Sequence, residues 1–311
     1  MSSTLTREIN IEQRQDHLCG YFQAMASPCE VLIDIAESSD ISPRHSLWDE
    51  AYKLVSAIAE EAWRIEDKYS RYRDDNIIYE INHARGRRVE IDSETFELLN
   101  LANTCYELSQ GRFDITSGIL GKVWQFDGSD NLPSQSVIDA CLACIGWHHV
   151  TLNEKYIHLL PGFALDLGGI GKEYAVDKCI QIARQQLPDF SVLINFGGDI
   201  SVTQPRKTLP YWQVGIEHPN PEEQTQMMVK IAQGGLATSG DAKRYLLKDG
   251  VRYGHVLSPH TGYPVMDAPR SVTVAGENCT QAGLLATLAL LQGAGAESFL
   301  KDQKITHWCL R

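Results

Sequence analysis

Apolar side chains recur three or four residues apart in the first quarter of the chain, as on one face of an amphipathic helix. These positions are Leu47, Ala51, Leu54, Val55, Ile58, Ala62, Ile65 and Tyr69. Similar patterns predict helices over residues 93–109, with Gly111 as a C-terminal stop, and over 171–187. Ser134 has the side chain of an N-cap and predicts a further short helix.

Short β-branched and aromatic runs bounded by turn residues predict strands. The expected strands are 31–36, 150–152, 157–160, 191–196, 212–216, 227–232, 243–247, 251–256, 271–275 and 304–310. Asp249-Gly250 is typical of a hairpin turn. Hairpins and segregated helices together predict an α+β fold with mixed or antiparallel sheets and packed helices. Without a repeat or a clear linker, we expect one large domain over 21–311 after a polar N-terminal segment, 1–20.

Residues 271–291 predict a strand, a turn and a buried helix. Asn278 and Thr280 are both candidates for the N-cap. Thr287 is the polar interruption in an otherwise apolar helix. Its hydroxyl either bonds a backbone carbonyl one turn earlier, which the local sequence favours, or is an oxygen ligand for a metal.

Composition narrows the class of protein. The chain has 43% hydrophobic and 22% charged residues, which is ordinary for a soluble globular protein. Its formal net charge of −12 argues against a surface that binds nucleic acid or an anionic membrane. The polar N-terminus and the lack of a long apolar run predict a cytoplasmic protein without a membrane anchor. Eight scattered Cys predict free thiols.

One group of Cys and His residues and one single His have both a chemical and a structural interpretation. Cys141 and Cys144 precede His148 and His149, but a helix packing its apolar face explains the cysteines better than zinc does. His255 precedes a loop rich in Pro and Gly; its near-neutral pKa suits proton transfer, although a lone His is more often structural.

A glycine-rich turn, D-L-G-G-I-G-K, spans residues 166–172 just before a predicted helix. Closely approaching backbone amides and a helix N-terminus favour an anion there, and Lys172 adds a positive charge. The spacing fits neither a Walker A loop nor G-x-G-x-x-G. A purely structural turn is an equally good explanation of this segment taken alone.

Seven segments, in order, resemble the ApbE family of FAD:protein FMN transferases over about residues 20–300. The segments are Y-S-R-Y-R-D-D-N, G-R-F-D-I-T-S-G, D-L-G-G-I-G-K-E-Y-A-V-D, I-N-F-G-G-D-I, A-T-S-G-D, G-H-V-L-S-P-H-T-G-Y-P-V and S-V-T-V with A-G-L-L-A-T. The resemblance implies an α+β fold that binds FAD with a divalent metal, usually Mg²⁺. It implies transfer of FMN from FAD to a Thr or Ser of an acceptor protein, with release of AMP.

The resemblance also implies roles for individual residues. The implied FAD-binding residues are Met25, Tyr72, Arg112, Phe113, Asp114, Asp166, Lys172 and His255. His255 corresponds to the proposed general base. Gly169 and Ala286, through their carbonyls, and Thr287 correspond to metal ligands.

The chain departs from the family pattern at Gly283, where A-D-A-L-A-T has an Asp. That Asp is the carboxylate on the metal, and its absence predicts weaker binding of a hard cation. Asp199, Asp241 and Glu277 are candidates to replace it. Two alternatives to the transferase therefore stay open: a flavin-binding or carrier protein that has lost metal and catalysis, and an FAD pyrophosphatase.

Overall fold

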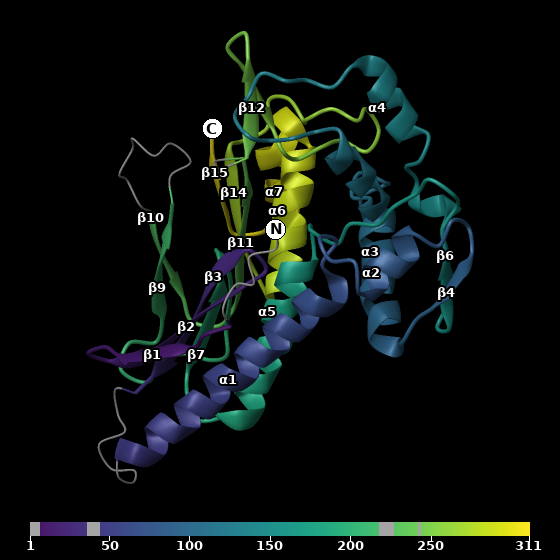
Figure 1. Cartoon of the computed structure of the whole chain (residues 1–311). Helices are drawn as coiled ribbons and strands as arrows, with labels where there is room; N and C mark the ends of the chain where they lie inside the picture. Colours follow the sequence, from purple (N-terminus) through teal and green to yellow (C-terminus); the bar gives the residue numbers. More distant parts are fainter. Residues whose placement is uncertain (1–6, 36–43, 218–226, 242–243) are drawn as a thin grey trace.

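Eight strands form one sheet in which every neighbouring pair is antiparallel (Figure 1). The computed structural model describes residues 7–35, 44–217, 227–241 and 244–311. In sheet order, the strands are β1 (Asn10–Gln13), β2 (His17–Ala24), β3 (Ser27–Asp34), β7 (Val192–Phe196), β8 (Asp199–Val202), β11 (Gly234–Gly240), β14 (Ser271–Gly276) and β15 (His307–Leu310).

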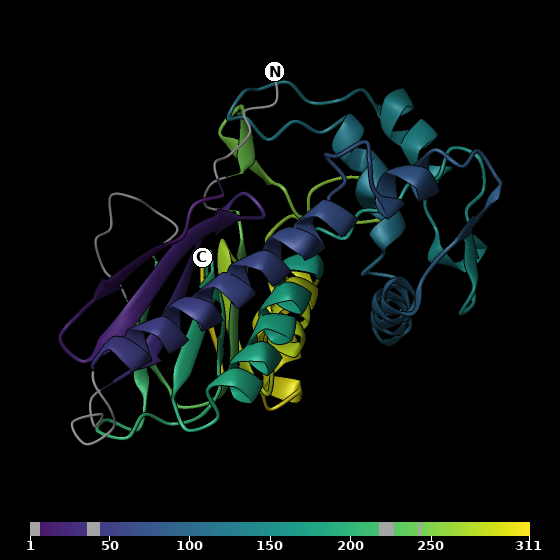
Figure 2. The same ribbon diagram turned by 60° about the horizontal axis from the view of Figure 1, so that its bottom comes forward.

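Three helices cover one face of this sheet and lie side by side (Figure 2). They are α1 (Arg44–Tyr69), α5 (Gly171–Gln186) and α6 (Cys279–Leu291). Alternation along β7 divides its side chains between the two faces: Ile194 packs in the core beneath the helices, whereas Leu193 faces a second cluster with Trp212. The hairpin of β9 (Trp212–Ile216) and β10 (Met227–Ile231) contributes to that second cluster.

A second group of elements lies beside the three helices, to the right in Figure 1. It contains α2 (Ile77–Asn82), α3 (Ser93–Leu108), η2 (Ile115–Lys122), α4 (Gln135–Leu142), η3 (Trp147–His149), β4 (Arg88–Glu90), β5 (Thr151–Leu152) and β6 (Tyr156–His158). The hairpin of β12 (Tyr245–Lys248) and β13 (Val251–Gly254) joins this group through a cluster that includes Trp124, Ile138 and Leu246. The chain ends through η4 (Gly293–Gly295), α7 (Ala296–Asp302) and β15.

The predicted α+β fold and all of the predicted helices are confirmed. Asn278 is the N-cap of α6, because its side chain accepts a hydrogen bond from the Gln281 N–H at 2.8 Å. Asp249 and Gly250 both have positive φ, 51° and 77°, as the hairpin prediction requires. Lys243, in the predicted strand 243–247, lies outside the described residues.

The N-terminal strands were not predicted. Residues 10–13 and 17–24 form β1 and β2, so the sheet begins within the segment that the sequence assigned to a polar extension, 1–20. β1 is an edge strand with exposed or partly exposed side chains, so it lacks the apolar alternation that identifies a strand. Among the described residues, no helix is both long and apolar enough to cross a membrane.

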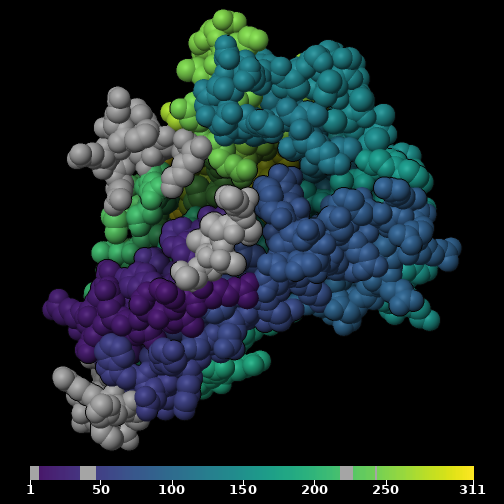
Figure 3. Space-filling model, in the orientation of Figure 1, coloured from purple at the N-terminus to yellow at the C-terminus, as the bar shows by residue number. Residues whose placement is uncertain are grey.

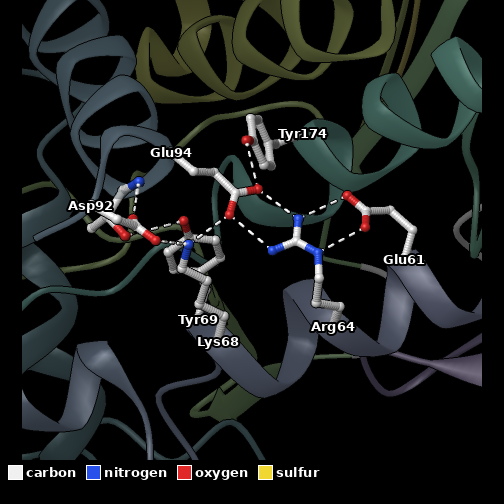
Figure 4. A network of polar contacts seen from close by, with 8 residues as sticks. Glu61, Arg64, Lys68, Tyr69, Asp92, Glu94 and Tyr174 are labelled. Carbon is white, nitrogen blue, oxygen red and sulfur yellow. Dashed lines mark hydrogen bonds and ion pairs between the residues drawn. The ribbon is translucent and has the colours of Figure 1, made fainter.

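An ion-pair network holds α1, α3 and α5 together (Figure 4). The Arg64 guanidinium donates to both carboxylate oxygens of Glu61 and of Glu94, at 2.6–2.8 Å. Lys68 donates to Glu94 and to Asp92, each at 2.6 Å, and the Tyr174 hydroxyl donates to Glu94 at 3.2 Å. Glu94 therefore accepts charge-assisted bonds from two helices that border the sheet.

We expect Glu94→Gln to lower the free energy of unfolding at pH 7 by about 1–3 kcal/mol. Hydrogen bonds from Arg64, and then from Lys68, hold the pKa of Glu94 at about 2 against the opposing effect of burial. Because this folded-state pKa is below the ordinary value of 4.5, the stabilisation is complete above pH 4.5 and is lost as the pH falls towards about 2.

Urea unfolding between pH 7 and pH 2.5 tests this expectation. The acid-dependent loss of stability should be smaller in Glu94→Gln than in the parent protein. Glu97→Gln, at an exposed position one turn further along α3, is the matched control and should match the parent protein. Equal stability of Glu94→Gln and Glu97→Gln would contradict a stabilising role for the network.

Candidate functional site

The first two turns of α5 pack against the first two turns of α6. Asp177 of α5 accepts hydrogen bonds from the backbone N–H groups of Cys279 and Thr280, both at 2.9 Å, and so caps the start of α6. One turn away along each helix, Glu173 of α5 lies against Gly283 of α6. A Cβ atom placed on Gly283 would lie 2.6 Å from both Cγ and Oε1 of Glu173.

Thr287 faces β11. Its hydroxyl lies 2.8 Å from the Ser239 hydroxyl. The local interpretation, in which this hydroxyl bonds a backbone carbonyl one turn earlier, is therefore not what the structure shows. Ala286 is fully buried beside it. Two predicted metal ligands are thus adjacent at one point of α6.

The glycine-rich turn carries Gly169 and leads into α5. Ile170, at the N-cap position of α5, provides no side-chain cap. The N–H groups of Ile170 and Gly171 donate to the Leu167 carbonyl, at 3.0 and 2.7 Å, so the next N–H, that of Lys172, is the one that this helix start offers to an anion. The Phe113 ring packs against Gly169: a Cβ on Gly169 would lie 3.1 Å from Phe113 Cε2. This contact joins two of the predicted site segments.

Lys172 forms an ion pair with a buried carboxylate, Asp199 of β8, at 2.7 Å. Burial raises the pKa of Asp199, against the opposing effect of Lys172. A Cβ on Gly197 would lie 2.7 Å from Ser27 Oγ and 3.9 Å from Lys172 Nζ. Ser27, which begins β3 directly after the turn at Met25, is therefore close to Lys172.

Met25 itself has a positive φ of 53° at the tip of the β2–β3 turn. Its backbone N–H donates to Glu66 of α1 at 2.9 Å, which fixes the turn over the helix layer. The Met25 side chain is partly buried against the main core.

Asp166 pairs with an arginine that the sequence analysis did not single out. Arg71 Nη1 donates to Asp166 Oδ2 at 2.7 Å, and Arg71 Nη2 donates to the Tyr72 hydroxyl at 3.1 Å. The guanidinium also lies over the Tyr72 ring, 4.8 Å from its centroid. Tyr72 is 77% exposed, so its ring is accessible to a planar ligand. Arg71 lies within the quoted Y-S-R-Y-R-D-D-N segment, but in a charged loop an arginine gives no sign of its partner.

Arg112 and Asp114 have protein partners. Arg112 Nη1 donates to Gln292, at the C-cap of α6. Asp114 is buried, and its carboxylate accepts bonds from the backbone N–H groups of Thr116 at 2.8 Å and Trp147 at 3.0 Å. In this structure, Asp114 fixes the loop that carries Phe113.

His255 follows β13 and lies near the end of β11. A Cβ on Gly254 would lie 3.0 Å from Asp241 Cβ, two residues after Ser239. The imidazole is edge-on to Phe126, with ring centroids 6.3 Å apart. Burial lowers the pKa of His255 below 6.5, so its ring is neutral at pH 7. Within the described ranges, its buried Nδ1 has no hydrogen-bond partner.

Glu173 is the second residue that the sequence analysis missed. It is buried, and its Oε2 has no hydrogen-bond partner among the described residues. Burial, and then the charge of Asp199, raises the pKa of Glu173. No sequence signal pointed to this residue, because its significance lies in its contact with Gly283.

The three carboxylates considered for the missing Asp are placed differently. Asp199 is bound to Lys172, Asp241 accepts from Arg252 at 2.9 Å, and Glu277 is exposed. The part of the chain that the structure describes contains no group of three His, Cys, Asp or Glu side chains that could hold a metal. All eight cysteine thiols are free, including those of Cys141 and Cys144.

The contacts above bring the segments of Met25, Phe113, Asp166 and Lys172 to the start of α5. Ala286 and Thr287 lie on α6, whereas Arg112 contacts the C-cap of α6 and His255 lies beside Phe126. The surface is hollowed between the N-terminal strands and α1 on one side and the β12–β13 hairpin on the other, and yellow atoms from the C-terminal part of the chain lie deep within it (Figure 3).

Comparison with known proteins gives consistent results. The ApbE family pattern matches residues 25–308. An FAD:protein FMN transferase of Klebsiella pneumoniae is 32% identical over 256 residues, covering 80% of this chain and 77% of the relative. An FAD:protein FMN transferase of Vibrio cholerae is 28% identical over 235 residues, covering 74% and 70%.

Solved structures show the same fold. The crystal structure of the ApbE protein of Thermotoga maritima has a TM-score of 0.81 and 28% identity, covering 97% of this chain and 94% of that one. The apo flavinyl transferase ApbE of Pseudomonas stutzeri has a TM-score of 0.80 at 23% identity, covering 97% and 92%. Because the ApbE family pattern matches residues 25–308, which is nearly the whole chain, the chain belongs to the ApbE family.

Proposed function

We propose that this protein transfers the FMN half of FAD to a Thr or Ser hydroxyl of an acceptor protein and releases AMP. Family membership and the activity named for its relatives support this function. The observation that carries it is the neutral, partly buried His255 beside the end of β11, the strand that also contacts Thr287.

The binding residues have separate tasks. The exposed Tyr72 ring, held by Arg71, offers a face for the flavin or adenine ring. The backbone N–H of Lys172 at the start of α5 suits the pyrophosphate. Lys172 adds positive charge there, and its pairing with Asp199 fixes its position.

The reaction is a substitution at the phosphorus of the FMN half. The acceptor oxygen forms a bond to this phosphorus as the bond to the AMP phosphate oxygen breaks, and AMP leaves with that electron pair. His255 accepts the proton of the attacking hydroxyl. Because burial keeps its pKa below 6.5, the imidazole is in the basic form at neutral pH.

A divalent cation, in the family usually Mg²⁺, would neutralise charge on the pyrophosphate when bound. We propose three groups as its ligands: the Thr287 hydroxyl and the backbone carbonyls of Ala286 and Gly169. All are oxygen donors, as Mg²⁺ prefers. Glu173 of α5 lies against Gly283, one turn of α6 before Thr287. Its buried Oε2 has no hydrogen-bond partner among the described residues, which supports a cation at this place.

The direct test incubates the purified protein with FAD, MgCl₂ and an acceptor protein of the Klebsiella pneumoniae relative. Mass spectrometry should find AMP and an acceptor heavier by FMN less water. The same acceptor with its flavinylated hydroxyl replaced by Ala should stay unmodified, and EDTA should reduce transfer.

Other results of this experiment would identify one of the two alternative functions. AMP and free FMN without an acceptor would identify an FAD pyrophosphatase. Tight FAD binding that is indifferent to Mg²⁺, with neither AMP nor modified acceptor, would identify a flavin-binding or carrier protein and overturn the proposed transfer.

Arg71→Gln is expected to weaken FAD binding about tenfold, or about 1.4 kcal/mol. The substitution removes the bond that holds Asp166 and the cation that orients Tyr72. Arg73→Gln is the matched control in the same loop, because Arg73 pairs with Asp75 and Asp67 on the exposed surface. Quenching of flavin fluorescence measures the affinity of each variant for FAD. Equal FAD affinities of Arg71→Gln and Arg73→Gln would exclude a role of Arg71 in FAD binding.

A further inference from the structure

We infer that Glu173 supplies the carboxylate of the metal site in this chain, in place of the Asp that the family pattern has at position 283. The inference rests on the proposed function, because it concerns the divalent cation of the same site. Gly283 then does not mark the loss of the metal-binding carboxylate, because this carboxylate comes from the neighbouring helix, α5.

The two positions share one space. A Cβ on Gly283 would lie 2.6 Å from Glu173 Cγ and Oε1 and 2.9 Å from Cδ, closer than non-bonded carbon atoms approach. A side chain at position 283 and the Glu173 carboxylate in its present rotamer therefore cannot occupy this space together. Because Gly283 has no side chain, the side chain of Glu173 can occupy this space.

The register of the helices brings this carboxylate to the predicted ligands. Asp177 contacts Cys279, and Glu173, one turn earlier in α5, contacts Gly283, one turn later in α6. The helices thus run antiparallel here. Four residues back from Glu173 is Gly169, in the turn before α5, and four residues on from Gly283 is Thr287 of α6. Residues 283 and 287 also lie on the same face of α6, because they are four apart.

The bonding of the neighbouring acids distinguishes Glu173. Asp177 caps α6, and Asp199 binds Lys172. Glu173 is only 7% exposed, and its Oε2 has no hydrogen-bond partner among the described residues. Burying a carboxylate oxygen without a partner is costly, and a cation at this junction would provide the missing partner.

The resulting donor set suits a hard cation. It has one carboxylate, the Thr287 hydroxyl and the carbonyls of Gly169 and Ala286, with the pyrophosphate of FAD to complete it. This set contains one acidic side chain.

Mn²⁺ binding in the presence of FAD, followed by electron paramagnetic resonance, tests the inference without using catalysis. Glu173→Gln keeps the shape and removes the charge, and it should weaken Mn²⁺ binding at least about tenfold. Glu277→Gln, at the exposed acid near the start of α6, is the matched control and should bind Mn²⁺ as the parent protein does.

A pair of exchange variants makes the test specific. Gly283→Asp alone should lower the Tm, since its side chain overlaps Glu173. Glu173→Ala with Gly283→Asp should recover both the Tm and Mn²⁺ binding, because the carboxylate returns from the other helix.

Unchanged Mn²⁺ affinity in Glu173→Gln, or no Mn²⁺ binding by the parent protein with FAD, would overturn the inference. Failure of the proposed function is recognised separately, by the absence of AMP and modified acceptor in a protein whose Mn²⁺ binding still depends on Glu173.

Discussion

Replacing His255 by Gln is expected to slow FMN transfer by about 10²- to 10⁴-fold, the usual contribution of a general base. FAD binding should change much less than the rate, since the imidazole acts on the acceptor hydroxyl. The expected result is a loss of kcat at nearly constant FAD affinity, measured by AMP release and by flavin fluorescence.

The pH dependence gives a second, independent readout. A base works when it is deprotonated, so the rate should fall as the pH decreases through the pKa of His255. Burial sets this pKa below 6.5, so the decline in activity should have its midpoint below pH 6.5. This acid limb should disappear from the residual rate of His255→Gln.

His260→Gln is the matched control, because His260 is an exposed histidine in the adjacent loop. It should retain both the rate and the acid limb. A His255→Gln variant with the parent rate, or one that keeps the same acid limb, would show that another group accepts the proton.

Gly235→Ala is expected to destabilise the fold by about 3 kcal/mol or more, at the upper end of what overpacking costs. A Cβ on Gly235 would lie 2.2 Å from the carbonyl carbon of Asn278 and 2.4 Å from the Cys279 nitrogen. Both are backbone atoms at the start of α6, so no rotation of a flexible side chain relieves the overlap.

The displacement should also reach the site. The start of α6 is fixed by the Asn278 cap and by Asp177, so moving it shifts Gly283 and Thr287 with the helix. We therefore expect Gly235→Ala to lose Mn²⁺ binding together with stability. Thermal unfolding and electron paramagnetic resonance measure the two effects.

Gly295→Ala is the control for a glycine-to-alanine change. Its Cβ would meet only Gln292 Cβ, at 3.7 Å, and the position is exposed, so we expect a change within about 0.5 kcal/mol. Equal thermal stability of Gly235→Ala and Gly295→Ala would show that α6 can move away from β11 at little cost.

Much of the fold could be predicted from the sequence because its signals are local. The spacing of Leu54, Ile58 and Ile65 determines which face of α1 is buried, and all three are in the core. Asp249-Gly250 specifies the β12–β13 turn through the backbone angles that these residues tolerate. The ordered motifs identified the family, whose fold and pattern the comparisons then confirmed.

The resemblance also named His255, Asp166 and Thr287, although it could not say what each of them touches. Tertiary structure gave Asp166 its partner Arg71 and gave Thr287 its partner Ser239. It also placed the β1 edge strand, whose exposed pattern has no local signature.

The role of Glu173 was decided only by the tertiary structure. In the sequence, Gly283 indicates a missing carboxylate, and Glu173 is one acid among many on an amphipathic helix. Their relation depends on the antiparallel packing of α5 on α6, which Asp177 fixes from one helix to the backbone of the other. Such packing joins residues far apart in the chain, and periodicity and local propensity contain no information about which of them will meet.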